Sequence, residues 1–133
     1  MIVVDASITV AWLLAEEEAA STRSVYEQVM QTGIAGPAIY QIEVLNALRT
    51  ALRRKSITRE KRDEALAAFM RMIVADPGPE AELTEVANIS DRHDLTAYDA
   101  SYVALAKLRN VPLATLDEAM ARAARAEGIP VLP

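Results

Sequence analysis

The chain has 133 residues, the length of one ordinary domain, and we expect a single domain over residues 1–133. A hydrophobic fraction of 52% is enough for a packed core, and the absence of cysteine excludes disulfides and thiolate metal sites. The net charge is −5, and with His93 as the single histidine a metal site would need oxygen ligands, which favours Mg²⁺ or Mn²⁺.

The first 72 residues are predicted to form two short strands and four helices. The strands are the β-branched run at residues 2–4, which ends at Asp5, and a weaker candidate at residues 34–36. Helices are expected at about residues 7–15, 21–31, 39–55 and 58–72. Ser21 is the expected N-cap of the second helix and Gly33 its stop. In the third helix apolar residues recur at helical spacing, at Ile42, Leu45, Leu48 and Leu52.

The second half of the chain continues this alternation. A possible strand at Val74–Ala75 precedes a turn-rich segment at residues 76–79. Further helices are expected at about residues 80–92, 97–109 and 117–127, and further strands at 112–116 and 129–132. Pro130 places the last strand at a sheet edge. The alternation predicts an α/β sandwich in which about seven helices cover a short, mainly parallel central sheet.

Four acidic residues are candidates for one site. Asp5 directly follows the first strand, Asp117 follows another strand, and Asp99 lies in the first turn of a predicted helix. Glu43 lies inside the third helix, with Asn46 one turn further on the same face. Sites in parallel α/β sheets form beyond the carboxyl ends of the strands, where these acids can meet.

Each acid also has a purely structural explanation. Asp5 and Asp117 are good N-caps, Thr96 and Asp99 resemble a capping box, and Glu43 can be a solvated helix residue. These explanations leave open why two charges directly follow buried apolar strands. Clustered carboxylates repel one another unless a cation neutralises them, and a divalent cation held in this way can activate water for phosphoryl displacement.

Positive charge is concentrated between Arg49 and Arg62. This segment holds seven basic residues and one acid, Glu60, so it carries +6 and the rest of the chain −11. The basic residues are Arg49, Arg53, Arg54, Lys55, Arg59, Lys61 and Arg62. The segment could hold phosphate groups, and a solvated pair of helices would show the same pattern.

The sequence as a whole resembles a PIN-domain ribonuclease, specifically the VapC toxin of a VapBC-type (type II) toxin–antitoxin system. The matching segments occur in family order along the whole chain: IVVDAS (2–7), WLL (12–14), GP (36–37), EVLNAL (43–48), LTAYDASYVALA (95–106), LATLD (113–117) and GIPVL (128–132). The resemblance implies a PIN-like three-layer α/β/α sandwich.

The resemblance also implies a role for each candidate residue. Asp5 and Asp99 would be the primary Mg²⁺ ligands, with Asp117 and Glu43 completing the catalytic pocket directly or through waters. The matching polar positions beside the site are Ser7, Asn46 and Thr115. In the family, a Mg²⁺-activated water hydrolyses the RNA phosphodiester, and Mn²⁺ is a possible substitute.

The partners implied by the resemblance are a VapB-like antitoxin, a second copy of the chain in a homodimer, and RNA. Whether the RNA is tRNA, rRNA or mRNA stays open. We expect a cytoplasmic protein without a membrane segment, because the apolar N-terminus lacks a basic flank and Asp5 interrupts it.

Two other functions remain as alternatives. One is a catalytically silent PIN-like module that binds RNA or protein. The other is a different Asp-based phosphoryl-transfer enzyme, which is disfavoured because Asp5-Ala6-Ser7 lacks a second acid and the chain has only four glycines. The aromatic residues Trp12, Phe69, Tyr98 and Tyr102 are expected in the core or an interface, and His93 at the surface or a helix cap.

Overall fold

The central sheet of the computed structural model has four parallel strands, and the structure describes residues 1–72 and 78–133. The strand order is β2-β1-β3-β4, with β1 (Ile2–Val4), β2 (Ile34–Ala35), β3 (Leu113–Ala114) and β4 (Val131–Leu132). Val4 pairs with Ala114, so β1 and β3 end side by side. The edge position of β4 is confirmed, and the predicted strand at Val74–Ala75 lies outside the described residues.

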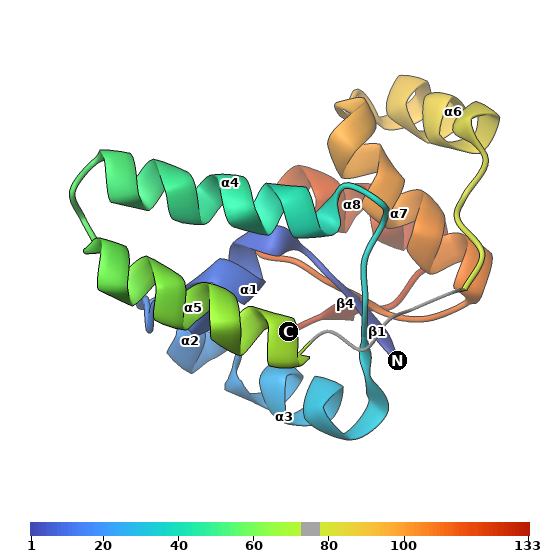
Figure 1. Cartoon of the computed structure of the whole chain (residues 1–133). Helices are drawn as coiled ribbons and strands as arrows, with labels where there is room; N and C mark the ends of the chain where they lie inside the picture. Colours follow the sequence, from blue (N-terminus) through green and yellow to red (C-terminus); the bar gives the residue numbers. More distant parts are fainter. Residues whose placement is uncertain (73–77) are drawn as a thin grey trace.

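Helices on both sides of the sheet give the predicted α/β/α fold (Figure 1). They are α1 (Ala6–Leu13), α2 (Glu18–Ser21), α3 (Arg23–Thr32), α4 (Tyr40–Arg53), α5 (Arg59–Met72), α6 (Leu83–His93), α7 (Ala97–Arg109) and α8 (Glu118–Ala126). Helix α7 packs on β1 and β3, α8 packs on β4, and α1 packs on α4 and α5. Helices α4 and α5 form a long hairpin that extends from one side of the molecule (Figure 1).

The described residues contain eight helices, one more than expected, because a short additional helix, α2, precedes α3 and is separated from it at Thr22. Ser21 ends the short helix α2, so its predicted role as the cap of the next helix is wrong. The interruption falls at Thr22, whose hydroxyl accepts a hydrogen bond from the Trp12 indole at 2.8 Å and donates to the Glu18 carbonyl at 2.8 Å. This contact between helices fixes a break that local sequence does not show.

Helix α4 forms as predicted, but it buries a different face. Its buried residues are Tyr40, Val44 and Leu48, which recur every four residues. Ile42 and Leu45, two of the residues at the predicted apolar spacing, are 66% and 38% exposed. The error arises because spacing alone does not select between two overlapping apolar stripes on one helix.

Tyr40 lies at the centre of an aromatic cluster that joins α4 to its neighbours. Its ring meets the rings of Phe69 and Tyr102 edge-on, at centroid distances of 5.6 and 6.4 Å. Its hydroxyl forms a 2.7 Å hydrogen bond with Thr9 Oγ1 of α1. A Cβ added at Gly36 would lie 2.4 Å from Tyr40 Cγ, so only glycine fits beneath this ring.

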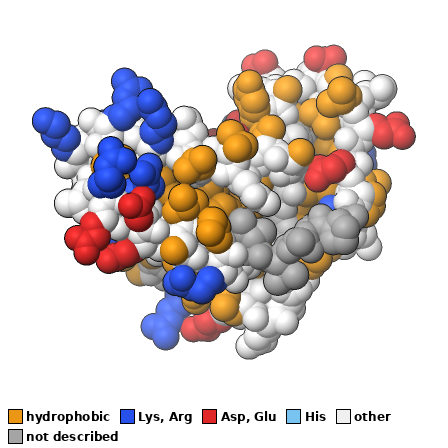
Figure 2. Space-filling view, in the orientation of Figure 1, with side chains coloured by type: hydrophobic (Ala, Val, Ile, Leu, Met, Phe, Trp, Pro, Cys, Tyr) orange, Lys and Arg blue, Asp and Glu red, His pale blue; other side chains and the backbone are white. Residues whose placement is uncertain are grey.

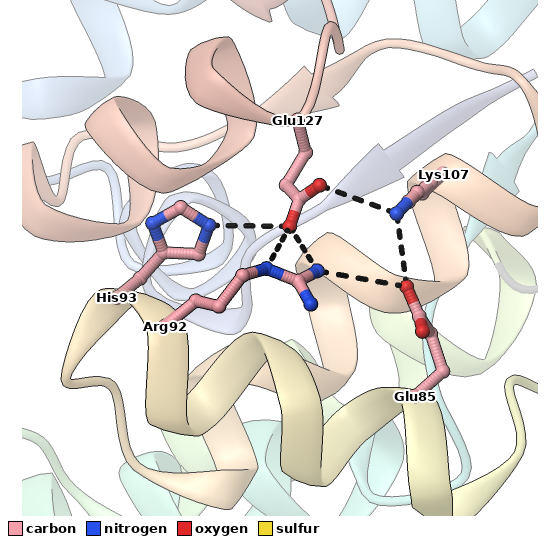
Figure 3. Close-up of polar contacts among 5 residues, drawn as sticks. All are labelled: Glu85, Arg92, His93, Lys107 and Glu127. Carbon is pink, nitrogen blue, oxygen red and sulfur yellow. Dashed lines mark hydrogen bonds and ion pairs between the residues drawn. The ribbon is translucent and has the colours of Figure 1, made fainter.

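A network of charges joins the ends of α6 and α8 to α7 (Figure 3). Glu127, next to the end of α8, accepts hydrogen bonds from Arg92 Nε at 3.1 Å and Lys107 Nζ at 3.2 Å. Its Oε1 also lies 3.2 Å from His93 Nε2, and Glu85 is within 2.9 Å of Lys107 Nζ. Glu127 therefore binds side chains from both α6 and α7. His93, expected at the surface or at a helix cap, is the last residue of α6, is partly buried, and precedes the C-cap Asp94.

Candidate active site

Asp5 is held at the carboxyl end of β1 by several hydrogen bonds. Its backbone N–H donates to the Ala114 carbonyl of β3 at 2.9 Å. Its side chain caps α1, with Oδ1 accepting from Ser7 N at 3.3 Å. Oδ2 accepts from both the Ser7 and Thr115 hydroxyls at 3.0 Å. These donors satisfy a buried carboxylate, which would otherwise be costly, and fix its orientation.

Thr115 connects Asp5 to Asp117. The buried Thr115 hydroxyl donates to Asp5 and accepts from the Asp117 backbone N–H at 3.0 Å. Asp117 caps α8, because its Oδ1 accepts a hydrogen bond from Met120 N at 2.7 Å. Asp117 is itself exposed to solvent. Both aspartates therefore serve as N-caps, as expected, and they also lie near each other at the sheet edge.

Asp99, in the first turn of α7, lies close enough to both of these aspartates to interact with their charges. Thr96 caps this helix and accepts a hydrogen bond from Asp99 N at 3.1 Å. Partial burial raises the pKa of Asp99, and the negative charges of Asp117 and then Asp5 raise it further. The three carboxylates therefore share one electrostatic environment although they come from three separate segments.

Glu43 approaches the same environment from α4. Partial burial raises the pKa of Glu43, and the charges of Asp5 and Asp99 add to this effect. The Tyr102 hydroxyl donates a hydrogen bond to Glu43 Oε2, which favours the ionised form and partly opposes the increase in pKa. Tyr102 lies three residues beyond Asp99, so α7 supplies both an acid and the donor that holds Glu43.

The structure thus brings all four predicted acids to the carboxyl edge of β1 and β3. It also places Ser7 and Thr115 in contact with Asp5. Asn46 is exposed, and the described residues include no hydrogen-bond partner for its side chain. Sequence analysis missed the role of Tyr102, for which the only signal was its helical spacing from Asp99.

The remaining aromatic residues follow the expectation unevenly. Phe69 and Tyr102 are buried, and Trp12 is partly buried against the core. Tyr98 is instead 62% exposed, which excludes the core for it and leaves the expected interface position as a prediction. It lies in the first turn of α7 and borders a cleft of about 340 Å³ together with Ile39 and Leu83.

The donor set suits a hard divalent cation in chemical type. All four acids offer oxygen ligands, and their mutual repulsion is the situation that a cation relieves. Within residues 1–72 and 78–133, however, no three acidic or histidine side chains are placed to hold a metal ion together. Mg²⁺ retains several waters and needs only one or two direct carboxylates, so the oxygen donors can suit it without such a group of three.

Comparison with known proteins identifies the class of this fold and site. The PIN domain family model matches residues 2–126, and the chain belongs to the PIN-domain family. This confirms the family predicted from the sequence motifs. PIN domains are generally nucleases, which typically use divalent metals, so the family places the chain among hydrolases of nucleic acid.

Two solved structures share the fold. PAE2754 from Pyrobaculum aerophilum matches with a TM-score of 0.73 and 21% identity, over 98% of this chain and 89% of that one. FitAcB from Neisseria gonorrhoeae matches with a TM-score of 0.65 and 17% identity, over 100% of this chain and 97% of that one. No curated protein sequence matches the chain significantly. Across the described residues, none of the helices has both the length and the apolar character needed to span a membrane.

Proposed function

We propose that the chain is a metal-dependent endoribonuclease that acts as the toxin of a type II toxin–antitoxin pair. The observation that carries the proposal is the convergence of Asp5, Glu43, Asp99 and Asp117 in a chain of the PIN-domain family. The motif set that resembles VapC toxins supports the toxin assignment and, with it, a VapB-like antitoxin, a homodimer and a cytoplasmic location.

In this proposal Asp5 and Asp99 hold a Mg²⁺ or Mn²⁺ ion, and Asp117 and Glu43 complete its surroundings directly or through water. The cation, when bound, would neutralise charge on the phosphodiester and activate a water for attack. Asp5 is oriented by the hydrogen bonds that its carboxylate accepts from the hydroxyls of Ser7 and Thr115. Tyr102 holds the Glu43 carboxylate toward the other acids, which leaves Glu43 able to accept a proton at the site.

The exposed edge of the site suits a polymeric substrate. Asp117 is exposed, and Asp99 and Glu43 are only partly buried, so the carboxylates can be reached from solvent. An exposed, acidic site requires a cation before a negatively charged phosphate can approach. RNA is the substrate class that the VapC-like motif set implies.

The test is incubation of the purified chain, free of any antitoxin, with total cellular RNA in Mg²⁺, Mn²⁺ or EDTA. The Asp99→Asn variant is the control, and a DNA strand of matched sequence tests the choice of RNA. Metal-dependent RNA fragments that are absent with Asp99→Asn are expected. Equal cleavage by wild type and variant would reject the assigned site, and no cleavage by the folded, metal-loaded protein would reject the nuclease.

A catalytically silent module that binds RNA or protein is the second candidate function. It is favoured by one observation, that no three acidic or histidine side chains of the described residues are arranged as a ready metal site. Calorimetric titration with Mg²⁺ and Mn²⁺ separates the two candidates. Saturable uptake that is lost in Asp5→Asn and Asp99→Asn is expected for the nuclease, and absence of uptake for the silent module.

A further inference from the structure

The strongest concentration of exposed positive charge in the sequence lies at the end of the α4–α5 hairpin, beyond Glu43 along α4. We call residues 49–62 the basic hairpin: they comprise the end of α4, the connection and the first turn of α5. Blue side chains gather at this end of the molecule in Figure 2. The exposed basic residues are Arg49, Arg53, Arg54, Lys55, Arg59 and Lys61, and Arg62 is partly buried.

These cations are not neutralised by the protein itself. Arg62 pairs with Asp63 at 2.8 Å, whereas the other six form no ion pair with any described residue. The hairpin thus concentrates +6 on a chain whose remainder carries −11. Clustered like charges repel one another and attract an anionic partner, with a range of about 10 Å at 0.1 M salt.

The connection that carries these cations is firmly closed. Lys55 N donates to the Leu52 carbonyl at 3.0 Å, and Ser56 N donates to the Ala51 carbonyl at 3.1 Å. The Ser56 hydroxyl adds a 2.9 Å bond to the same Ala51 carbonyl. Lys55 itself takes the left-handed conformation, with φ of 59°, that allows this turn. The basic side chains therefore project from a defined scaffold.

Helix α4 connects the basic hairpin to the acids, because it also carries Glu43. Arg49 and Arg53 lie six and ten residues beyond Glu43, which corresponds to about 9 and 15 Å along a helix. Strand backbone in a nucleic-acid helix advances about 3.4 Å per nucleotide, so these distances span roughly three to five nucleotides. Measured along the helix axis, both arginines therefore lie within the length of a short RNA strand from Glu43.

We propose that the basic hairpin binds the phosphate backbone of the RNA strand a few nucleotides away from the bond that is cut. This inference rests on the proposed ribonuclease function and adds a substrate-binding surface to it. Backbone contacts position the strand and supply affinity, and they carry no sequence information of their own. The hairpin also compensates for the net negative charge that would otherwise repel RNA from the site.

A protein partner fits this surface less well than RNA. Protein interfaces are depleted in lysine and rich in apolar residues at their centres. The basic hairpin instead presents six exposed cations among the nine exposed residues of positions 49–61. The exposed apolar residues of α4, Ile42 and Leu45, lie nearer to the acids and outside the hairpin.

The test compares two variants that each lose two positive charges. Arg49→Gln/Arg53→Gln alters the basic hairpin, and Arg71→Gln/Arg125→Gln removes two exposed cations from the far end of α5 and from α8. Binding of a fluorescein-labelled, mixed-sequence, 20-nucleotide single-stranded RNA is followed by anisotropy in EDTA, from 50 to 300 mM NaCl. Thermal unfolding establishes that both variants are folded.

We expect the hairpin variant to bind RNA roughly tenfold more weakly at 100 mM salt, and the control variant to bind like wild type. The slope of log affinity against log salt should be shallower by about 1.4, because each phosphate contact in a single strand contributes about 0.7. Equal affinities and slopes for the two variants would overturn the proposal that the basic hairpin binds RNA. An acidic protein surface would then be the partner to test for the hairpin.

Cleavage assays separate this proposal from the nuclease assignment. Wild-type cleavage of total RNA together with unchanged RNA binding by the hairpin variant would reject only the basic hairpin. Hairpin-dependent RNA binding without metal-dependent cleavage by wild type would reject only the nuclease, because backbone binding does not need the acids. When both proposals hold, the hairpin variant cleaves RNA more slowly at subsaturating RNA and recovers when the salt concentration is lowered.

Discussion

Replacing Glu127 with glutamine should destabilise the fold in a pH-dependent manner. Hydrogen bonds and ion pairs from Arg92, His93 and Lys107 lower the pKa of Glu127 from 4.5 to about 2. A difference of about 2.5 pKa units corresponds to an upper limit of about 3.4 kcal/mol. The Glu127 side chain is 11% exposed, but those of Arg92 and Lys107 are 47% and 41% exposed, so water screens the pairs. We therefore expect a loss of about 1–2 kcal/mol at pH 7.

The pH dependence provides the sharper measurement. Because the folded-state pKa is lower than the unfolded-state pKa, the Glu127 contribution is present above pH 4.5 and is lost as the pH falls toward 2. Urea unfolding of wild type and Glu127→Gln at pH 7, 5, 4 and 3 should therefore give curves that converge, with more than half of the difference gone by about pH 3. A difference that stays constant from pH 7 to 3 would refute the electrostatic explanation and assign the loss to packing.

Three further predictions concern the acids and their support. Asp99→Asn should raise the thermal stability of the metal-free protein at pH 7.5. The pKa of Asp99 is raised in the folded state, so its negative charge destabilises the fold above the folded-state pKa and has no effect below the unfolded-state pKa. A gain in stability that persists at pH 3 would contradict this. Tyr102→Phe should cost about 0.5–1.5 kcal/mol in urea unfolding and slow RNA cleavage without abolishing it, since Glu43 loses one donor but stays in place; wild-type rates would show that the bond does not position Glu43. Gly36→Ala should destabilise the fold by about 1–3 kcal/mol through collision with the Tyr40 ring, whereas an unchanged urea midpoint would show that the ring moves freely.

Elements with strong local signals could be predicted closely from the sequence. Helix α7 has the predicted bounds, because Thr96 caps its start and Asn110 ends it in the left-handed conformation. The turn after α3 is likewise marked by Gly33, with φ of 95°. The acids that follow β1 and β3 could also be placed from the sequence, because the sheet itself brings the ends of its parallel strands together.

Features set by contacts between distant segments could not be predicted in this way. The break at Thr22 depends on the Trp12 indole, and the choice of buried face on α4 depends on its packing against α1 and α5. The bond between Tyr102 and Glu43 joins residues 59 positions apart. In each case the deciding partner lies on another element, so neither periodicity nor local propensity identifies it.

The electrostatics of the molecule divide into a favourable and an unfavourable region. Glu127 has a lowered pKa because cations surround it, whereas Asp99 and Glu43 have raised pKa values because burial and other carboxylates surround them. A fold selected only for stability would not collect acids at one sheet edge, since each charge there opposes the others. The hydrogen bonds to Asp5 offset part of this cost, and the remainder is what a bound cation would relieve. Because the acids repel one another, we expect that they lie together in order to bind a ligand and not to stabilise the fold.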